Sequence, residues 1–381
     1  MDTQPPHQQA LHRQAADLEA LAGDARLRSL IPRAGVDFSS NDYLGLASSG
    51  LLDDAARSAL DRGVPMGSGG SRLLRGNDPE HTALEDEAAT LFGCESVLFF
   101  SSGFAANAAL LSTLPQRGDL ILYDALIHAS AHEGMRLSRA ESAAFPHNNV
   151  DALSDALSSW RTNGASGTAW IAVESLYSMD GDRAPLDDLM SLADRYGAML
   201  LVDEAHATGV FGPYGRGLAA HLDGRSNVIT LRTLGKALGC EGALLCGPTV
   251  MREFLVNRAR GFIFSTAPSP LIAAVARAAL QIMVEHPERR TALQARLALA
   301  DRLLSPLGIA STGSPIIPII LGDNARAMSA ASALQAVGYD VRGIRPPTVP
   351  TGTARLRLSI TLNAGDNAIG GLAAELAKVL A

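Results

Sequence analysis

The chain has 381 residues, 47% of them hydrophobic, so it can bury a substantial core in two or three domains. Its 32 basic and 39 acidic residues give a net charge of −7, without the long basic run that would indicate nucleic acid as a partner. The three cysteines show neither zinc-site spacing nor a disulfide framework, and no segment resembles a signal peptide or a membrane span. We expect a cytoplasmic protein with no metal site and no membrane partner.

Short apolar runs that end in polar or glycine-bearing turns recur through much of the chain. They lie at residues 97–100, 120–123, 170–173, 199–202, 228–231 and 243–246. Runs of this length suit strands that are buried on both faces. Helical patterns separate them, for example Pro79 through Leu91 behind an Asp78 cap, and residues 186–196. Alternation of this kind predicts an α/β domain built on a mainly parallel sheet.

The pattern changes near residue 275. A long alanine- and leucine-rich helix is expected from there, and residues 316–321 and 355–360 follow as strands of a smaller unit. We expect three parts, which are an N-terminal arm over residues 1–45, a large domain over residues 46–275 and a small C-terminal α+β domain over residues 276–381.

Polar residues directly after the apolar runs are candidate site residues, because ligands bind at the carboxyl ends of strands in an open α/β sheet. Lys236 follows the run 228–231, and Gly235 and Gly239 beside it allow a ligand to approach the backbone closely. A lysine so placed can become a Schiff-base nucleophile if its neighbours keep the amine neutral. The alternative is a solvated lysine on a loop.

Asp203 directly follows the run 199–202, so its carboxylate would emerge from the buried end of a strand, where a charge needs a partner. A protonated pyridine nitrogen would supply that partner, and the ion pair would keep such a ring an effective electron sink. His206 lies three residues further on and can reach the same ring. An N-cap aspartate and a satisfied core histidine are the alternative interpretation.

Three further segments are ambiguous. Gly103 and Phe104 lie between a strand and a helix, where backbone N–H groups can hold a phosphate, but a serine–glycine pair is also ordinary turn chemistry. His128, after the run 120–123, either stacks on a ring or fills a cleft. The glycine-rich stretch 67–72 is either a flexible loop or a close approach to a ligand or second subunit; it is not a Walker loop.

Taken together and in this order, these segments resemble the α-oxoamine synthases, the pyridoxal 5′-phosphate (PLP) enzymes that condense an amino acid with an acyl thioester and release carbon dioxide. The resemblance covers nearly the whole chain and implies an aspartate-aminotransferase-like PLP-dependent transferase fold. Its carriers are FSSNDYLGL (38–46), GSGGSRLLRGN (67–77), SSGFAAN (101–107), HAS (128–130), SMDGD (178–182), VDEAHATGVFG (202–212), TLGKALG (233–239) and RPPTVPTGTARLRLS (345–359).

The resemblance also implies a role for each candidate. Lys236 would hold PLP as a Schiff base, and Asp203 would pair with the pyridine nitrogen. His206 would meet the ring hydroxyl, and His128 would stack on the ring face beside the substrate. The remaining cofactor ligands that it implies are Gly103, Phe104, Ser178, Thr233 and, from the neighbouring subunit of a homodimer, Thr266.

For the substrate, the resemblance implies that Arg345 binds the amino-acid carboxylate, with Thr348 beside the substrate and Asn41 near the same place. The family also has an arginine in the N-terminal arm, where this chain offers Arg26 and Arg28; we favour Arg28. The wording of the motifs favours the branch that joins L-alanine to a pimeloyl thioester, carried on CoA or on an acyl carrier protein. Glycine-using sister enzymes, an aminotransferase or lyase on the same fold, and a cofactor-binding protein without catalysis are the alternatives.

Overall fold

The computed structural model describes residues 6–380, which form two compact units. One unit joins the residues through Ser40 to those from Ala295 onward, and the other comprises Asn41–Gln294. The boundaries expected from the sequence lie after residues 45 and 275. None of the helices within residues 6–380 is long and apolar enough to cross a membrane.

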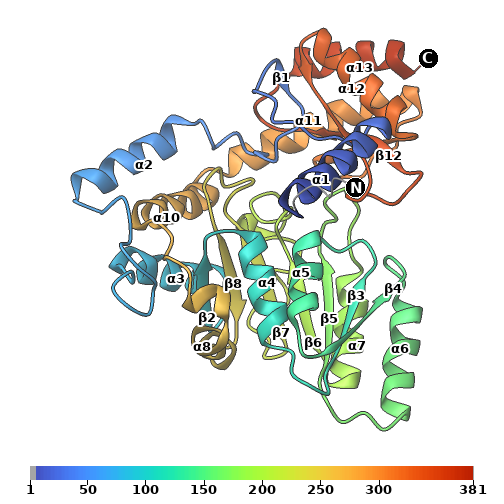
Figure 1. Ribbon diagram of the computed structural model, residues 1–381. Helices are drawn as coiled ribbons and strands as arrows, with labels where there is room; N and C mark the ends of the chain where they lie inside the picture. Colours follow the sequence, from blue (N-terminus) through green and yellow to red (C-terminus); the bar gives the residue numbers. More distant parts are fainter. Residues whose placement is uncertain (1–5, 381) are drawn as a thin grey trace. The chain divides into compact units, whose positions relative to one another are not determined.

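A seven-stranded sheet in the order β2-β8-β7-β6-β5-β3-β4 organises the larger unit (Figure 1). Neighbouring strands are parallel except β8, which is antiparallel to both β2 and β7. The mainly parallel sheet is therefore confirmed, and all six apolar runs form strands. The strands are β2 (Ser96–Phe100), β3 (Leu120–Asp124), β4 (Glu141–Phe145), β5 (Ala169–Glu174), β6 (Met199–Asp203), β7 (Val228–Thr233) and β8 (Ala243–Gly247).

Alternate side chains of the buried strands enter two separate cores, because successive residues of a strand point to opposite faces. Ile121 and Leu201 belong to one core, and their neighbours Leu122 and Leu200 belong to the other. Both faces are covered, which explains why the runs are continuously apolar. The first core is covered by α4 (Gly103–Thr113), α5 (Ala129–Leu137), α8 (Thr249–Arg258) and α9 (Arg260–Ile263), the second by α6 (Val150–Thr162) and α7 (Leu186–Tyr196).

Helix α10 (Pro270–Glu285) packs against both α2 (Gly50–Asp61) and α3 (Pro79–Phe92) in the larger unit (Figure 1). α3 begins at the predicted cap, where the Asp78 side chain accepts the N–H of Glu80, and it ends at Gly93 in the left-handed conformation.

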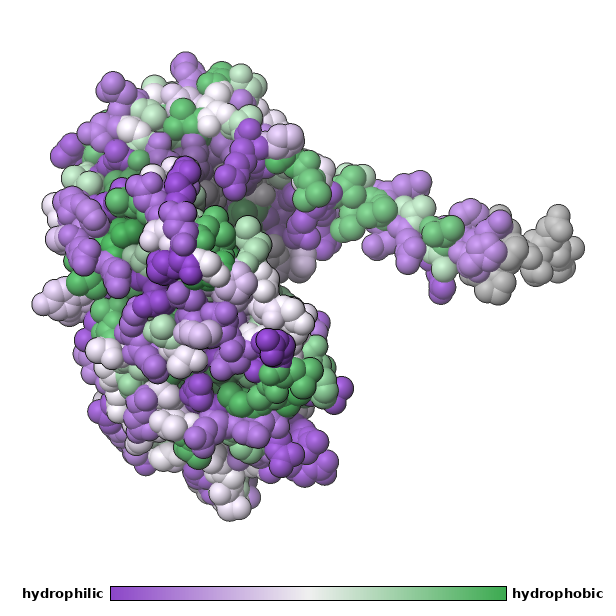
Figure 2. All heavy atoms as spheres, turned by 90° about the vertical axis from the view of Figure 1, so that its left-hand side faces the viewer, coloured by the Kyte–Doolittle hydropathy of each residue, from purple (hydrophilic) through white to green (hydrophobic). Residues whose placement is uncertain are grey.

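Hydrophilic and hydrophobic side chains are interspersed on the face that Figure 2 shows. The structure also contains two short 3₁₀ helices, η1 (Pro213–Gly215) and η2 (Ser305–Leu307).

Two sequence expectations need correction. The single long helix expected from residue 275 is wrong, because α10 ends at Glu285 and α11 (Pro287–Leu304) begins two residues later. Pro287 has no N–H for a continuing helix and disfavours helical backbone at His286, which has φ −114° and ψ 60°. Strand β4 was also missed, since four of its five residues are exposed and no apolar run marks it.

The smaller unit contains an antiparallel sheet in the order β11-β12-β9, with α12 packed against it and α13 packed against α12. Its two predicted strands, residues 316–321 and 355–360, are confirmed as β9 and β12 to within one residue at each end. The N-terminal segment adds a short strand, β1, parallel to β10. The elements are α1 (Pro6–Gly23), β1 (Val36–Asp37), β9 (Ile316–Gly322), α12 (Asn324–Ala336), β10 (Tyr339–Asp340), β11 (Arg342–Ile344), β12 (Ala354–Ser359) and α13 (Asp366–Leu380).

Candidate active site

The carboxyl ends of β5, β6 and β7 lie side by side and carry the central polar residues of the larger unit. Glu174, the last residue of β5, pairs in register with Asp203, the last residue of β6. β7 ends at Thr233, and Lys236 follows three residues later. Three strand ends that the sequence marked separately therefore meet at one edge of the sheet, where α/β proteins bind ligands.

Lys236 is half-buried and is not a solvated loop residue. Its Nζ lies 2.7 Å from Nε2 of His206, which is buried on the turn after β6. On the other side of the same imidazole, Nδ1 lies 2.7 Å from the hydroxyl of the fully buried Tyr43. Tyr43 had no role predicted from the sequence, although it lies inside the NDYLGL motif.

Hydrogen bonds hold the Asp203 carboxylate on both of its oxygens. Oδ1 accepts the N–H of Ala205 at 2.9 Å, and Oδ2 accepts the Asn107 amide at 2.7 Å. The same amide nitrogen donates to the Ser130 hydroxyl at 3.0 Å, and that hydroxyl lies 2.8 Å from Nδ1 of His128. Asn107 was missed in the sequence. Its position in α4, one helical turn beyond Gly103 and so on the same face, is the signal that would have found it.

His128 is the N-cap of α5, where its Nδ1 accepts the N–H of Ser130 at 3.2 Å. Desolvation is the main cause that lowers the pKa of His128; the Asp203 charge opposes it, and the nearby Lys236 lowers the pKa further. The imidazole is therefore neutral near pH 7, and it lies within electrostatic reach of both residues.

Glu174 is a second carboxyl beside Asp203, but its surroundings differ. It is buried, and its Oε2 accepts the N–H of Ser178 at 3.1 Å. Burial raises the pKa of Glu174 well above its usual range, and the neighbouring Asp203 raises it further. The protonated form of Glu174 is therefore favoured beside Asp203. The hydrogen bond from Ser178 to Glu174 also holds that predicted residue at this edge of the sheet.

The start of α4 offers a place for a phosphate. The Ser102 hydroxyl caps the helix by accepting the N–H of Ala105, so the N–H groups of Gly103 and Phe104 are left outside the intrahelical pattern. A Cβ added to Gly103 would lie 3.8 Å from Oγ1 of Thr233, which brings the helix start next to the end of β7. An anion fits there, because N–H groups and the helix dipole both favour negative charge.

The cationic residues expected to bind substrate come together in the smaller unit. Nη2 of Arg28 donates to Oγ1 of Thr348 at 3.2 Å. Burial, and then the nearby charge of Arg28, lower the pKa of Arg345. Two like charges are therefore held close, which suits an anionic ligand. Arg26 differs, because its guanidinium forms an ion pair with Asp24 at 3.5 Å.

The last two predicted residues lie elsewhere in the larger unit. Oδ1 of Asn41 accepts the Tyr43 hydroxyl at 3.1 Å, so Asn41 is connected through Tyr43 to His206. Thr266 is exposed in the segment after α9, where it helps to line a small cavity together with Ser101.

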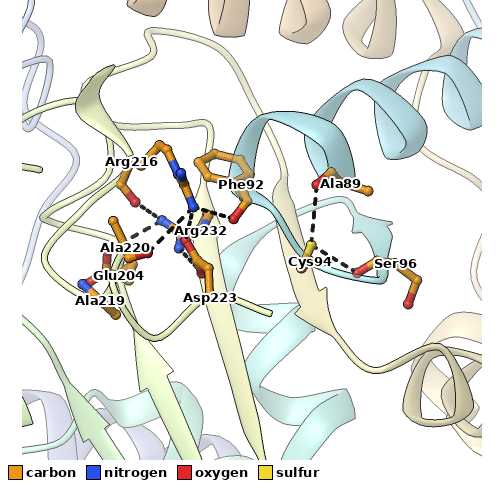
Figure 3. A network of polar contacts seen from close by, with 10 residues as sticks. All are labelled: Ala89, Phe92, Cys94, Ser96, Glu204, Arg216, Ala219, Ala220, Asp223 and Arg232. Atoms are coloured by element: carbon orange, nitrogen blue, oxygen red, sulfur yellow. Dashed lines mark hydrogen bonds and ion pairs between the residues drawn. The ribbon is translucent and has the colours of Figure 1, made fainter. Parts of the chain in front are cut away.

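A buried ion cluster supports the same ends of β6 and β7 (Figure 3). The fully buried Arg232 places Nη2 2.7 Å from Oδ1 of Asp223 and Nη1 3.4 Å from Oε2 of Glu204, and its guanidinium lies 4.2 Å from the ring centre of Phe92. Glu204 directly follows Asp203, and Arg232 directly precedes Thr233. The cluster therefore fixes the backbone that carries two site residues. Arg232 was not predicted as a site-supporting residue, although an arginine directly after the apolar run 228–231 is a visible signal in the sequence.

Comparisons with known proteins place the chain among the PLP-dependent transferases of the aminotransferase-like fold. The model of the family "Aminotransferase class I and II" matches residues 33–370. Among solved structures, serine palmitoyltransferase from S. paucimobilis with bound PLP–myriocin aldimine is 26% identical, covers 96% of each chain and has a TM-score of 0.88. An 8-amino-7-oxononanoate synthase from Francisella tularensis is 30% identical over 91% of this chain and 98% of its own, with a TM-score of 0.77.

Curated relatives narrow the class. The 8-amino-7-oxononanoate synthase of Anaeromyxobacter dehalogenans (strain 2CP-1) is 44% identical over 96% of this chain and 94% of its own. The one of Geobacter sulfurreducens is 40% identical over 99% of this chain and 96% of its own. The chain belongs to the 8-amino-7-oxononanoate synthase family, whose members are PLP-dependent acyltransferases. The resemblance noted in the sequence, the fold and the cofactor are thereby confirmed.

Proposed function

We propose that the protein condenses L-alanine with a pimeloyl thioester, releasing 8-amino-7-oxononanoate, carbon dioxide and free thiol in biotin synthesis. The observation that carries the proposal is the meeting of Lys236, His206 and Asp203 at one sheet edge, in a chain whose curated relatives bear the name of this synthase. The acyl carrier is CoA or an acyl carrier protein.

Bound PLP supplies an electron sink for the negative charge that develops at the amino acid's Cα, both on proton removal and on loss of carbon dioxide. Asp203 would hold a proton on the pyridine nitrogen, and the Asn107 amide would keep that carboxylate in place. The neutral Glu174 adds no second negative charge beside it. His128 would contact the ring face and the substrate, while His206 and Ser178 would complete the shell around the ring.

Lys236 would have two tasks. It would hold the cofactor covalently in the resting enzyme, and its freed amine would take the α-proton of alanine and later return a proton to the product. The contact between its Nζ and the His206 imidazole supports this proposal, because a neighbouring imidazole can accept or donate a proton as the amine changes state.

Anionic groups would be bound at two places. The N–H groups of Gly103 and Phe104, with Thr233 beside them, would hold the cofactor phosphate. The guanidinium of Arg345 would bind the alanine carboxylate, supported by Arg28 and Thr348. Asn41 is the remaining proposed substrate residue.

We also propose a homodimer in which Thr266 of one subunit contacts the phosphate held by the other. Two large exposed side chains, Phe104 and Phe254, line one open cavity of about 910 Å³ beside α4 and α8. Exposed apolar surface of this kind commonly marks an interface between subunits.

The lysine that binds the cofactor covalently can be identified simply, because the chain contains few lysines. The chain has two lysines, Lys236 and Lys378, and Lys378 lies on α13 in an ion pair with Glu375. Borohydride reduction of the yellow holoenzyme should bleach the visible band and fix the cofactor on the Lys236 peptide. A label on the Lys378 peptide would contradict the proposed role of Lys236.

The reaction is tested by incubating the holoenzyme with L-alanine and a pimeloyl thioester and measuring all three products. We expect 8-amino-7-oxononanoate, carbon dioxide and thiol in equal amounts. Pyruvate without thiol would identify an aminotransferase instead, and no turnover would identify a passive binder. Faster turnover of glycine with a short acyl-CoA would keep the family but exclude the alanine assignment; one methyl group in a pocket discriminates by about 1–3 kcal/mol.

A further inference from the structure

A chain of short contacts links four side chains of the larger unit and ends at Lys236. The Tyr43 hydroxyl lies 3.1 Å from Oδ1 of Asn41 and 2.7 Å from Nδ1 of His206, and Nε2 of His206 lies 2.7 Å from Nζ of Lys236. Tyr43 is fully buried and His206 is nearly so. Nδ1 of the imidazole therefore faces Tyr43, and Nε2 faces Lys236.

When Lys236 is protonated, the position of the hydrogen in each of these contacts follows from the donors and acceptors available. An ammonium group only donates, so Nε2 of His206 must accept from it, and a neutral imidazole then carries its hydrogen on Nδ1. Nδ1–H donates to the Tyr43 oxygen, and the phenolic hydrogen is directed to Asn41. Each of the three contacts then contains one hydrogen, with no clash of two donors.

The deprotonated state of Lys236 permits the opposite order. A neutral lysine nitrogen has a lone pair and can accept from Nε2–H, while the phenolic hydrogen of Tyr43 turns from Asn41 to Nδ1. A phenol serves both arrangements because it donates one hydrogen and also accepts. The direction of these hydrogen bonds can thus reverse when Lys236 gains or loses its proton. The buried side chains keep their positions in both arrangements.

We propose that Tyr43 is a positioning residue that sets the tautomer of His206 and thereby allows the Lys236 amine to change its protonation state inside a buried site. The proposal rests on the function proposed above for Lys236. Its consequence is that Tyr43 controls the pH at which the amine becomes a nucleophile.

Removal of the Tyr43 hydroxyl should lower the pH at which the Lys236 amine loses its proton. In Tyr43→Phe, a hydrogen on Nδ1 of His206 loses the Tyr43 oxygen as its acceptor, which shifts the balance towards the tautomer with the hydrogen on Nε2. That tautomer presents a donor to Lys236 and disfavours its ammonium form. Glu174 on β5 and His128 before α5 also lie within electrostatic reach of the amine, with Asp203 on β6 beside both of them, and the substitution keeps all three side chains.

The test uses the apoenzyme, so it does not depend on turnover. When the protein is labelled with ¹³C,¹⁵N-lysine, the NMR spectrum contains the side-chain signals of only two lysines, and Lys378 serves as an internal reference. We expect the titration midpoint of the Lys236 amine to fall by about one pH unit in Tyr43→Phe and to stay constant for Lys378. With ¹⁵N-labelled histidine, the hydrogen of His206 should move from Nδ1 to Nε2 at a pH where wild-type Lys236 is charged.

Tyr177→Phe is the matched control, because Tyr177 is equally buried and contacts His147 rather than His206. It should leave the Lys236 titration unchanged. If Tyr43→Phe does not fold, Asn41→Ala removes the acceptor of the phenolic hydrogen and should move the midpoint in the same direction by less.

An unchanged Lys236 midpoint together with an unchanged His206 tautomer in Tyr43→Phe would overturn the proposal. Equal shifts in Tyr43→Phe and Tyr177→Phe would also overturn it, because a general loss of packing would then be the cause. Failure here is distinct from failure of the proposed function, which the borohydride label and the product assay decide on the holoenzyme.

Discussion

At the scale of single residues, two adjacent carboxyls acquire different properties from their surroundings. Glu174 and Asp203 end neighbouring strands and pair in register. Burial raises the pKa of Glu174, whereas the Asp203 carboxylate accepts hydrogen bonds from Asn107 and Ala205. Environments that separate two acids in this way commonly divide the work of an active site between them. We therefore propose an electrostatic role for Asp203 and a structural role for Glu174.

The Asp203→Asn variant tests this assignment. The change is nearly isosteric, so the fold should persist, but an amide cannot keep the pyridine nitrogen protonated. We expect the exchange of the alanine α-proton with solvent to slow by roughly 10²-fold or more, measured by NMR without an acyl donor. Asp188→Asn on the exposed face of α7 is the control. Wild-type exchange in Asp203→Asn would show that the carboxylate is structural.

At the scale of elements, one histidine, His147, connects segments at the carboxyl ends of β3, β4 and β5. His147, just after β4, lies 2.9 Å from Oδ1 of Asp124 at the end of β3 and 2.8 Å from Oδ2 of Asp182 in the SMDGD segment. Burial alone would lower the pKa of His147, but the hydrogen bonds and charges of the two aspartates outweigh it and raise the pKa to about 10. A charged imidazolium thus links three segments that follow different strands.

This linkage predicts a pH-dependent stability. Since the folded-state pKa of His147 lies above the ordinary 6.5, its contribution is complete below about pH 6.5 and is lost as the pH rises towards 10. Between pH 7 and 9 the unfolding free energy of the wild type should fall more steeply than that of His147→Gln. The difference is at most about 1.4 kcal/mol per pH unit, reduced by solvent screening at the partly exposed ring.

Urea unfolding of both proteins at pH 7, 8 and 9 measures this difference, and other titrating groups cancel in the comparison. Ser159→Ala, which removes an exposed hydroxyl that does not titrate, should retain the wild-type slope. Parallel profiles for wild type and His147→Gln would show that the imidazole is not charged in the folded protein.

At the scale of the whole molecule, the two units carry different parts of the proposed chemistry. The larger unit contains Lys236, Asp203 and the helix start at Gly103, while the smaller unit contains Arg28, Arg345 and Thr348. Within the smaller unit, the N-terminal segment and the C-terminal residues are joined by the Arg28–Thr348 hydrogen bond and by the β1–β10 pairing. Chain segments more than three hundred residues apart therefore form one cationic group.

The two arginines of the N-terminal segment should differ in their effect on substrate binding. Arg28→Gln is expected to raise the KM for alanine roughly 10- to 100-fold, the usual effect of losing a hydrogen bond to a charged group. Arg26→Gln should change it little, because Asp24 already pairs with that guanidinium. Steady-state kinetics at saturating acyl donor, with Arg326→Gln on the exposed side of α12 as control, decide between them. The reverse order of effects would make Arg26 the substrate residue.

Local patterns in the sequence account for most elements and for several site positions. The six apolar runs became strands because each is buried on both faces. Asp203 was recognisable since it directly follows such a run, and Lys236 since it lies in the turn a few residues after another. β4 and the break at Pro287 escaped prediction. An exposed edge strand has no hydrophobic signal, and a proline at the first position of a new helix resembles one within a continuous pattern.

The sequence by itself determined the α/β class, the family and the residue types of the site, because periodicity and motif order are properties of neighbouring residues. Only the tertiary structure decided which side chains touch. It brought Tyr43 to His206 and Asn107 to Asp203 across 163 and 96 positions, and it joined Arg28 to Thr348 across 320. Such contacts depend on sheet order and helix packing, which bring distant segments together, so no local pattern along the chain encodes them.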